Sequence, residues 1–247
     1  MPADDLDAQI TAPLGAWPGD LNGPQVDFMK GRRLSASGYA IVTAIQDERL
    51  VLKFFYDVNT GKDVTPQVTR ELRMMLLAGE DVSVTVEGRF IVRGQLVGFV
   101  MPHETALDLQ LPKATKRGWI EQLQSLVRRM HDKAIIHGDI KPDNILLRKS
   151  DGRLVFCDWG ASQLKAEAMP PEEGTYMSPL RCHRYNLPLC EADDLYALGA
   201  TILHIWLGRS PFDPETDEFI EKDLEAVEDE TLRSLIEMYL AEAPAAV

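Results

Sequence analysis

Apolar runs in the first half of the chain predict a small antiparallel sheet. Residues 39–45 and 50–56 are rich in β-branched and aromatic side chains and are separated by a short polar turn. A second pair of apolar runs, residues 90–93 and 96–101, flanks a turn that contains Gly94. Runs of this composition that are bounded by turn residues are typical of β-strands. We therefore expect two hairpins that together form one sheet.

Helical periodicity predominates in the second half. Apolar positions recur at helical spacing in residues 113–132 and 230–240, and also in one earlier segment, residues 69–77. Residues 194–207 are apolar on nearly every side, which is the pattern of a helix buried at the centre of a domain. We expect an α+β fold in which a sheet with one helix is followed by a mainly helical part.

The N-terminal residues 1–24 differ from the rest of the chain in composition. Several prolines and glycines stand there among acidic residues, and such a segment has little apolar surface to bury. We expect either a flexible tail or an extended strap over the domain. The remainder divides into a small sheet-containing lobe, residues 25–103, and a mainly helical lobe, residues 104–247.

Composition and charge exclude several classes of protein. The chain has 45% hydrophobic and 26% charged residues, as ordinary globular proteins do. Its net charge of −13 argues against binding of nucleic acid through the phosphates. The three cysteines form neither a disulfide framework nor a metal-binding pattern. Since we find no secretory signal and no apolar stretch of membrane-spanning length, we expect a soluble, intracellular, cytoplasmic monomer.

A polar cluster within residues 137–147 carries the most specific chemistry. Asp139, Lys141 and Asn144 stand between apolar runs that would anchor a short loop at both ends. In phosphoryl transfer a carboxylate accepts the proton of the acceptor hydroxyl, a lysine neutralises the transferred group, and an amide oxygen binds Mg²⁺. The spacing of these three residues suits the three tasks.

This stretch, His-Gly-Asp-Ile-Lys-Pro-Asp-Asn, closely resembles the catalytic loop of eukaryotic-type Ser/Thr protein kinases. Asp158-Trp-Gly is similar to the Asp-Phe-Gly motif of that family, whose aspartate binds Mg²⁺. The segment from Asp194 resembles the F helix, whose aspartate ties down the catalytic loop. The resemblance further implies that three residues support the loop structurally: His137, Thr175 and Asp194.

The resemblance implies a bilobal kinase fold and transfer of a phosphoryl group from ATP, with Mg²⁺, to Ser or Thr hydroxyls of protein substrates. Asp139 and Lys141 would be catalytic, and Asn144 and Asp158 would bind the metal.

Kinase-like features of the first lobe indicate a nucleotide site. Lys53 ends a strand as the phosphate-binding lysine of the family does, and Glu71 falls where a helix glutamate would pair with it. The segment 34–42 resembles the glycine-rich loop, but three small residues replace its glycines: Ser35, Ser37 and Ala40. The resemblance assigns nucleotide contacts to the following residues: Lys53, Glu71, Leu34, Val42, Val51, Met101, His103, Asp108 and Leu146.

Residues 161–178 resemble the kinase activation segment. Gly138 replaces the arginine that precedes the catalytic aspartate and that reads a phosphorylated activation loop. We therefore expect activity that does not require phosphorylation of this segment. Leu180 replaces a family glutamate whose arginine partner is absent as well, and the helical lobe is shorter than in the family.

Two other functions remain open at this point. The loop without the family's glycines and the short helical lobe would suit a pseudokinase that acts as a scaffold or allosteric partner. A kinase of small molecules, of the aminoglycoside or choline type, shares the His-Gly-Asp and Asp-Trp motifs. The Lys141-Pro142 and Gly174-Thr175 pairs favour a protein kinase over this second alternative.

Overall fold

The computed structural model describes residues 3–23, 31–57, 62–167, 176–178, 181, 187–216 and 218–241. The chain divides into two compact units, residues 1–104 and 105–247.

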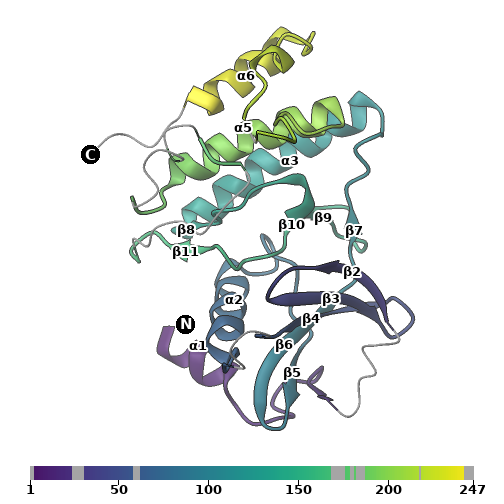
Figure 1. Cartoon of the computed structure of the whole chain (residues 1–247), viewed down its shortest axis with the longest axis vertical. Helices are drawn as coiled ribbons and strands as arrows, with labels where there is room; N and C mark the ends of the chain where they lie inside the picture. Colours follow the sequence, from purple (N-terminus) through teal and green to yellow (C-terminus); the bar gives the residue numbers. More distant parts are fainter. Residues whose placement is uncertain are drawn as a thin grey trace. The chain divides into compact units, whose positions relative to one another are not determined.

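A six-stranded sheet forms the scaffold of the first unit (Figure 1). Its strands are, in spatial order, β1 (Leu21–Asn22), β5 (Gly88–Val92), β6 (Gln95–Pro102), β4 (Leu50–Phe55), β3 (Ala40–Ile45) and β2 (Arg32–Ala36). Neighbouring strands are antiparallel, except that β1 runs parallel to β5. Both predicted hairpins, β3–β4 and β5–β6, are present. A core cluster lies on this sheet: Ile45, Leu52, Phe90 and Val100.

Two helices pack onto each other in the first unit. Helix α2 (Thr65–Ala78) packs against β6 and buries Val68, Leu72 and Met75, as its periodicity predicted. Helix α1 (Ala3–Ile10) packs on α2. The composition of residues 1–24 predicted neither α1 nor β1. Both elements form because α1 has an apolar face and β1 finds hydrogen-bond partners on β5.

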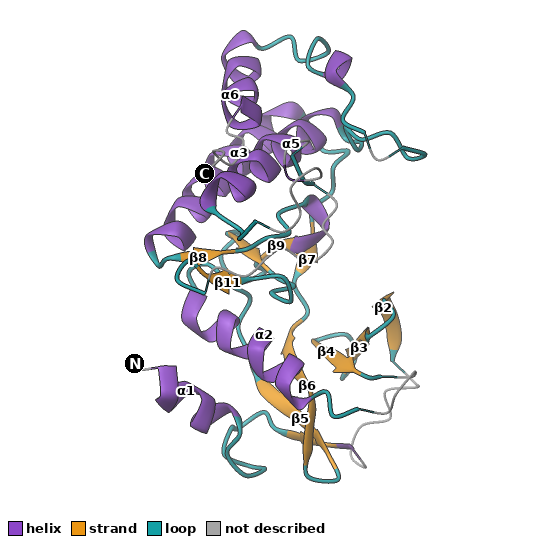
Figure 2. Ribbon diagram, turned by 60° about the vertical axis from the view of Figure 1, so that its left-hand side comes forward, coloured by secondary structure: helices purple, strands orange, loops and turns teal. Residues whose placement is uncertain are grey.

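Three long helices dominate the described part of the second unit (Figure 2): α3 (Lys113–Asp132), α5 (Glu191–Leu207) and α6 (Glu230–Ala241). Helix α5 packs against both others and is buried on nearly all sides, which explains its apolar sequence. No helix within the described ranges is both long enough and apolar enough to cross a bilayer.

Small strands connect the helices of the second unit. One sheet consists of β10 (Leu154–Phe156), β9 (Ile145–Leu147) and β7 (Thr105–Ala106), and another of β11 (Gln163–Leu164) and β8 (Ile135–Ile136). Two single-turn 3₁₀ helices, η3 (Pro142–Asn144) and η4 (Glu221–Asp223), complete the assigned elements. The α+β class expected from the sequence is confirmed.

Candidate active site

The loop expected to carry the chemistry is tethered at both ends by strands. β8 precedes it and pairs with β11, while β9 follows it and pairs with β10 and β7. Between these strands η3 begins at Pro142, whose fixed φ suits the first position of a helical turn. The apolar runs on both sides of the loop therefore act as the anchors that their pattern predicted.

Three polar side chains of this loop meet at Asp139. Lys141 Nζ lies 2.7 Å from Asp139 Oδ2. Asn144 Nδ2 donates to the same oxygen and to the backbone oxygen of Asp139, in both cases at 2.8 Å. The second carboxylate oxygen, Oδ1, is buried and has no hydrogen-bond partner among the residues that the structure describes. One oxygen is thus fixed by two donors, while the other is an acceptor available to a ligand.

Asp194, in the first turn of α5, anchors the backbone of the loop. Its Oδ2 accepts from the His137 N–H and its Oδ1 from the Gly138 N–H, both at 2.9 Å. His131, in the last turn of α3, places Nε2 2.9 Å from Asp194 Oδ2. Because Asp194 is only 1% exposed, these bonds replace the water that its carboxylate loses on burial. The catalytic loop is therefore held from the buried central helix.

His137 supports the loop as a packed, neutral ring. Its centroid lies 4.8 Å from that of Phe156 and 4.9 Å from that of Trp159. Its Nδ1 accepts a hydrogen bond from the Asp139 N–H at 3.3 Å. Burial lowers the pKa of His137 and outweighs the neighbouring carboxylates, which act in the opposite direction. Trp159 of the Asp-Trp-Gly motif is fully buried against this ring.

Asp158 stands where β10 ends, beside the loop. Its backbone has φ +59°, in the left-handed region that few non-glycine residues adopt. Phe156 pairs with Ile145 across the sheet, and the Cys157 N–H donates to Asn144 O at 3.0 Å. Asp158 and Asn144 thus lie at neighbouring strand ends. A carboxylate and an amide are oxygen ligands suited to Mg²⁺, which takes few protein ligands beside phosphates and water, so this donor set fits the ion.

In the first unit, Lys53 and Glu71 form the expected ion pair. Lys53 Nζ lies 2.7 Å from Glu71 Oε1 and 2.9 Å from Oε2. Lys53 is on β4 between β3 and β6, and Glu71 is on the buried face of α2. The Phe55 ring centroid lies 5.2 Å from Lys53 Nζ. Each buried charge requires its partner, so the pair fixes α2 against the sheet.

A family comparison covers most of the chain, including both of these clusters. The family model described as "Protein kinase domain" matches residues 35–242. The chain belongs to the protein kinase family. The kinase fold expected from the catalytic-loop motif is thereby confirmed.

Three similar proteins are kinases by name. MAP kinase kinase skh1/pek1 of Schizosaccharomyces pombe is 40% identical over 89 residues, which are 35% of this chain and 24% of that protein. MAP kinase kinase PBS2 of Saccharomyces cerevisiae is 38% identical over 101 residues, 38% of this chain and 15% of that protein. Serine/threonine-protein kinase PknA of Nostoc sp. is 31% identical over 115 residues, 43% of this chain and 20% of that protein.

The matches span a quarter or less of the length of these three relatives. The family model shows membership of the protein kinase family, and the Ser/Thr activity in the name of one relative is said of that protein alone.

The glycine-rich loop of this kinase domain is a tight turn closed by Ser37. The Ser37 N–H donates to Ala40 O at 2.8 Å, and the Ser37 hydroxyl oxygen accepts from the Ala40 N–H at 3.1 Å. The Tyr56 hydroxyl donates to Ser37 O at 2.6 Å. Gly38 lies in the turn, with open space where a Cβ would stand. Two residues that replace family glycines therefore bond to each other.

Other residues expected to contact the nucleotide lie on neighbouring strands of the first unit. Val51 and Met101 are buried cross-strand partners on β4 and β6. Val42 lies opposite Lys53 on β3, and Leu34 on β2 is 38% exposed. Their contact with a nucleotide stays a prediction.

Three nucleotide candidates remain. His103 lies at the end of the first unit, and Asp108 and Leu146 lie in the second. The His103 N–H donates to Arg49 O at 3.0 Å, and its ring Nδ1 lies 2.8 Å from Glu48 O. In the second unit, Asp108 Oδ1 accepts from the Gln110 N–H at 3.0 Å. Leu146 lies on β9 between β7 and β10. Asp108 thus has a local structural partner, and its role at a ribose stays a prediction.

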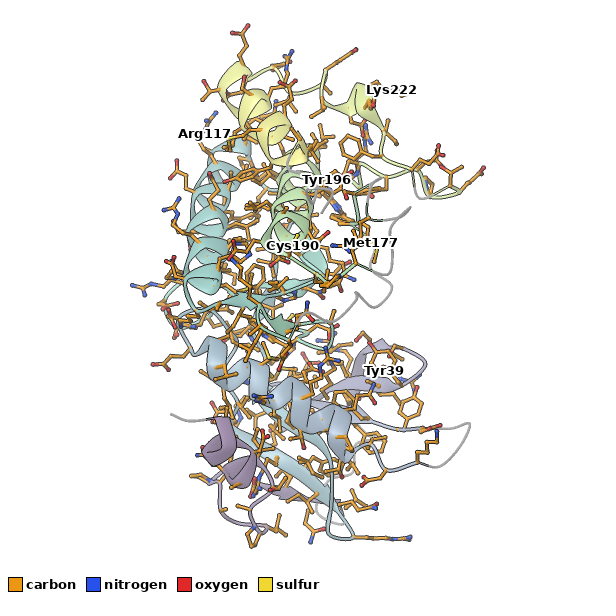
Figure 3. All side chains as sticks on the ribbon, turned by 90° about the vertical axis from the view of Figure 1, so that its left-hand side faces the viewer. Tyr39, Arg117, Met177, Cys190, Tyr196 and Lys222 are labelled. Atoms are coloured by element: carbon orange, nitrogen blue, oxygen red, sulfur yellow. The ribbon has the colours of Figure 1, made fainter. Side chains whose placement is uncertain are left out.

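A small pocket lies beside Asp139 in the second unit. Its lining combines the catalytic loop with residues 176–178, Leu189 and Ala197. Met177 belongs to this lining and lies beside α5 (Figure 3). Thr175, expected to brace the loop, lies outside the described residues. The pocket thus adjoins the Asp139 carboxylate.

A buried ion pair borders the same pocket. Arg181 Nε lies 2.8 Å from Asp193 Oδ1, and the two side chains are only 2% and 9% exposed. Arg181 also donates to the backbone oxygens of Leu187 and Pro188 at 2.6 and 3.0 Å. The chain thus has a buried pair adjoining Leu180, where the family's glutamate is missing.

Sequence reasoning missed several residues that support the loop. Thr201 Oγ1 donates to Ile140 O at 3.1 Å, and Ser162 Oγ donates to His137 O at 2.9 Å. Thr201 follows Asp194 by two helical turns, so their shared helix face was a usable signal. Ser162 has no such signal in the sequence.

Proposed function

We propose that this protein transfers the γ-phosphoryl group of ATP, with Mg²⁺, to Ser or Thr hydroxyls of protein substrates. The observation that carries the proposal is the state of Asp139. Its Oδ2 is held by Lys141 and Asn144, while its buried Oδ1 lacks a hydrogen-bond partner among the described residues. A fixed carboxylate with one available oxygen is what the acceptor hydroxyl requires.

Asp139 orients the acceptor hydroxyl through Oδ1 and takes its proton as the oxygen attacks the γ-phosphorus. Lys141, 2.7 Å from Oδ2, carries the positive charge that offsets the negative charge of the transferred group. Because both residues are placed before the substrate arrives, the reaction needs little reorganisation of the protein.

Asn144 and Asp158 would hold Mg²⁺, which neutralises and orients the phosphates when it is bound. The Asn144 amide nitrogen donates to Asp139, so the amide oxygen on the other branch of the side chain is directed elsewhere and is free to serve as a ligand. One residue would therefore couple the metal to the catalytic carboxylate.

Lys53 would bind the α- and β-phosphates while Glu71 holds its ammonium group in place. Membership of the family supports the assignment of this pair to the phosphates of a nucleotide. Gly138 supports the further proposal that activity does not require a phosphorylated activation segment, since this position offers no cation.

Replacing Asp139 by Asn tests the proposal. The change keeps the shape of the side chain and removes the base, so kcat for a generic Ser/Thr substrate should fall about 10² to 10⁴-fold. Asp143→Asn is the matched control, because Asp143 is an exposed carboxylate of the same loop. Equal activity of Asp139→Asn and wild type would show that the role is misassigned.

The turn at Ser37 favours a second candidate, a pseudokinase that binds partners without catalysis. The Ala40 N–H of the phosphate loop is already bonded to the Ser37 hydroxyl, which leaves it less available to a phosphate. Thermal unfolding with ATP and Mg²⁺ separates the two functions. A ligand present at 100 times its Kd raises the free energy of unfolding by about 2.7 kcal/mol, which shifts the unfolding temperature upward. Absence of any shift at millimolar ATP and Mg²⁺ favours the pseudokinase.

A further inference from the structure

Arg89 is the most deeply buried cation of the described first unit and belongs to none of the kinase motifs. The residue lies on β5 and is 0% exposed. Its Nε lies 3.0 Å from Asp20 Oδ1, and its Nη2 lies 2.5 Å from Asp20 Oδ2. Both side chains of this pair are 1% exposed. Each charge of this buried pair requires the other, because removing either partner would leave an uncompensated charge out of water.

What Arg89 holds is the end of helix α1. Its Nη1 donates to the backbone oxygens of Ile10 and Ala12 at 2.7 and 2.6 Å, and its Nη2 donates to Pro13 O at 2.9 Å. The last carbonyls of a helix lack intrahelical partners and carry a partial negative charge. Helix α1 has no basic residue in its own last turn. Arg89 therefore supplies the C-terminal cation from another element.

Asp20 ties the following segment to the same arginine. Its Oδ2 accepts from the Gly15 N–H at 3.0 Å and from the Trp17 N–H at 3.2 Å. The Trp17 ring lies 5.5 Å from the Arg89 guanidinium carbon. Burial raises the pKa of Asp20, but its bonds to Arg89 and Trp17 outweigh this and leave the pKa below the usual value. The carboxylate is thus ionised and paired.

Close backbone contact docks the segment on β5. A Cβ on Gly19 would lie 2.2 Å from Glu87 O, and one on Gly88 would lie 2.0 Å from Gly19 O. Leu21 then pairs with Phe90 as β1 joins the sheet. Only glycine at both positions permits this approach, so the sequence is adapted to hold residues 3–23 on the sheet.

The N-terminal end of residues 3–23, helix α1, packs on α2, the helix that carries Glu71. Leu6 and Ile10, one helical turn apart on α1, are 4% and 0% exposed, and α1 packs on α2. Asp7 Oδ1 lies 3.8 Å from Arg73 Nε of α2. Helix α2 itself has no side-chain N-cap, no acidic residue in its first turn and no basic residue in its last turn. Its position therefore depends on packing from its neighbours.

We propose that residues 3–23, fixed by Arg89 and Asp20, position α2 so that Glu71 stays paired with Lys53. Arg89 and Asp20 are positioning residues that act on the reaction through α1 and α2. This inference rests on the proposed function for its effect on catalysis. The placement of α2 is a separate, measurable property.

Arg89→Met should break the anchor. We expect kcat/KM for ATP to fall about 10 to 10²-fold, because small misplacements of groups remote from the chemistry have effects of this size. KM for the protein substrate should not change. Gly19→Ala should act in the same direction without leaving a charge unpaired, because the added Cβ pushes the segment off Glu87. Arg93→Met, an exposed arginine at the end of the same hairpin, is the matched control and should behave as wild type.

A second background distinguishes positioning from a general loss of stability. In the Glu71→Gln background the ion pair with Lys53 is already weakened. Adding Arg89→Met to this background should therefore lower kcat/KM for ATP by less than about twofold, so that the effects of the two substitutions are non-additive. Equal losses from Arg89→Met in the two backgrounds would overturn the proposal.

Amide hydrogen exchange over residues 65–78 gives a readout that does not need activity. Arg89→Met and Gly19→Ala should speed exchange in α2 while residues 113–132 of α3 keep their wild-type rates. Unchanged exchange in α2 would overturn the positioning role. An inactive wild-type enzyme with faster α2 exchange in these variants would refute the proposed function and leave the positioning role supported.

Discussion

Lys53 and Glu71 hold their ion pair almost entirely out of water: Nζ lies 2.7 Å from Oε1, and the side chains are 7% and 2% exposed. Removing two charges from water costs more than a surface pair gains, so the attraction between the charges serves mainly to offset their burial. The pair is therefore expected to matter more for the placement of a phosphate-binding ammonium than for the stability of the fold.

Stability and activity should consequently separate when the pair is replaced. Lys53→Met leaves Glu71 buried without its lysine and should lower the free energy of unfolding by about 3–5 kcal/mol. The double variant Lys53→Met/Glu71→Met should regain most of this loss, because apolar side chains of similar volume fill the same space. Both variants should lack kinase activity. Urea unfolding and a phosphorylation assay measure the two effects, and a double variant as unstable as the single one would contradict this account.

The Lys53–Glu71 pair was predictable because each residue lies in an element with a clear pattern. A continuous apolar run at residues 50–56 predicts the strand that carries Lys53, and helical periodicity predicts α2. The resemblance to kinases then singles out Glu71 on that helix. The catalytic-loop cluster was predictable for a similar reason, since Asp139, Lys141 and Asn144 lie within six residues and meet through local geometry.

The two remaining buried ion pairs described above were not predictable from local pattern. Arg89 and Asp20 are 69 residues apart, and a single arginine in a strand gives no sign of whether it faces solvent or a helix end. Arg181 is followed by residues without periodicity, and its partner Asp193 looks like an ordinary acidic residue in the first turn of a helix. Tertiary placement alone decides that these charges meet.

Gly138 leads to a prediction about regulation. Its N–H is bonded to Asp194, and its φ is +79°. A Cβ at this position would lie 2.9 Å from Ala161 O, so the backbone here suits glycine and not the family's arginine. Residue 138 offers no cation to a phosphorylated activation segment. Treatment with a phosphatase should therefore leave kcat unchanged within about twofold. Loss of a charge-assisted contact to a phosphate would lower kcat by more than this.

The measurement compares one preparation before and after phosphatase, with mass spectrometry to verify that residues 161–178 carry no phosphate. A tenfold loss of kcat on removal of phosphate from that segment would refute independence from phosphorylation.

Buried histidines make stability depend on pH. Burial lowers the pKa of His137 and also that of His204, whose Nδ1 is hydrogen-bonded to the Tyr176 hydroxyl. For such groups the unfolded chain binds the proton more readily than the folded protein, so stability is full above the unfolded pKa of about 6.5 and falls as the pH drops below it. Each such group adds at most about 1.4 kcal/mol per pH unit to this slope.

We expect the midpoint of urea unfolding to fall between pH 7.5 and pH 5.5. His204→Gln should reduce this fall, because the glutamine oxygen accepts from Tyr176 without titrating. Asp20, whose pKa is lowered, stays ionised throughout this range and contributes nothing to it. An unfolding midpoint that is constant from pH 7.5 to pH 5.5 would contradict the burial argument.

The Arg181–Asp193 pair leads to a prediction about the stability of the second unit and about substrate binding. The guanidinium binds Asp193 with two nitrogens, at 2.8 and 2.5 Å, and both residues line the pocket beside Asp139. A lysine at position 181 keeps the charge but cannot form the bidentate contact with Asp193. It also cannot reach the backbone oxygens of Leu187 and Pro188 at the same time. Arg181→Lys should therefore lower the free energy of unfolding by about 1–3 kcal/mol, the cost of leaving buried acceptors unsatisfied.

The same variant should raise KM for a peptide substrate and leave KM for ATP unchanged, because the pocket lies beside the acceptor end of the reaction. Arg32→Lys provides the control. Arg32 also binds a carboxylate with two nitrogens, Glu48 at 2.6 and 2.9 Å, but the two side chains are 57% and 51% exposed. Exposed pairs contribute about 0–1 kcal/mol, so this change should affect neither stability nor KM appreciably. Equal effects of the two substitutions would show that burial beside the pocket gives Arg181 no special role, and a change in KM for ATP alone would place its influence on the nucleotide instead.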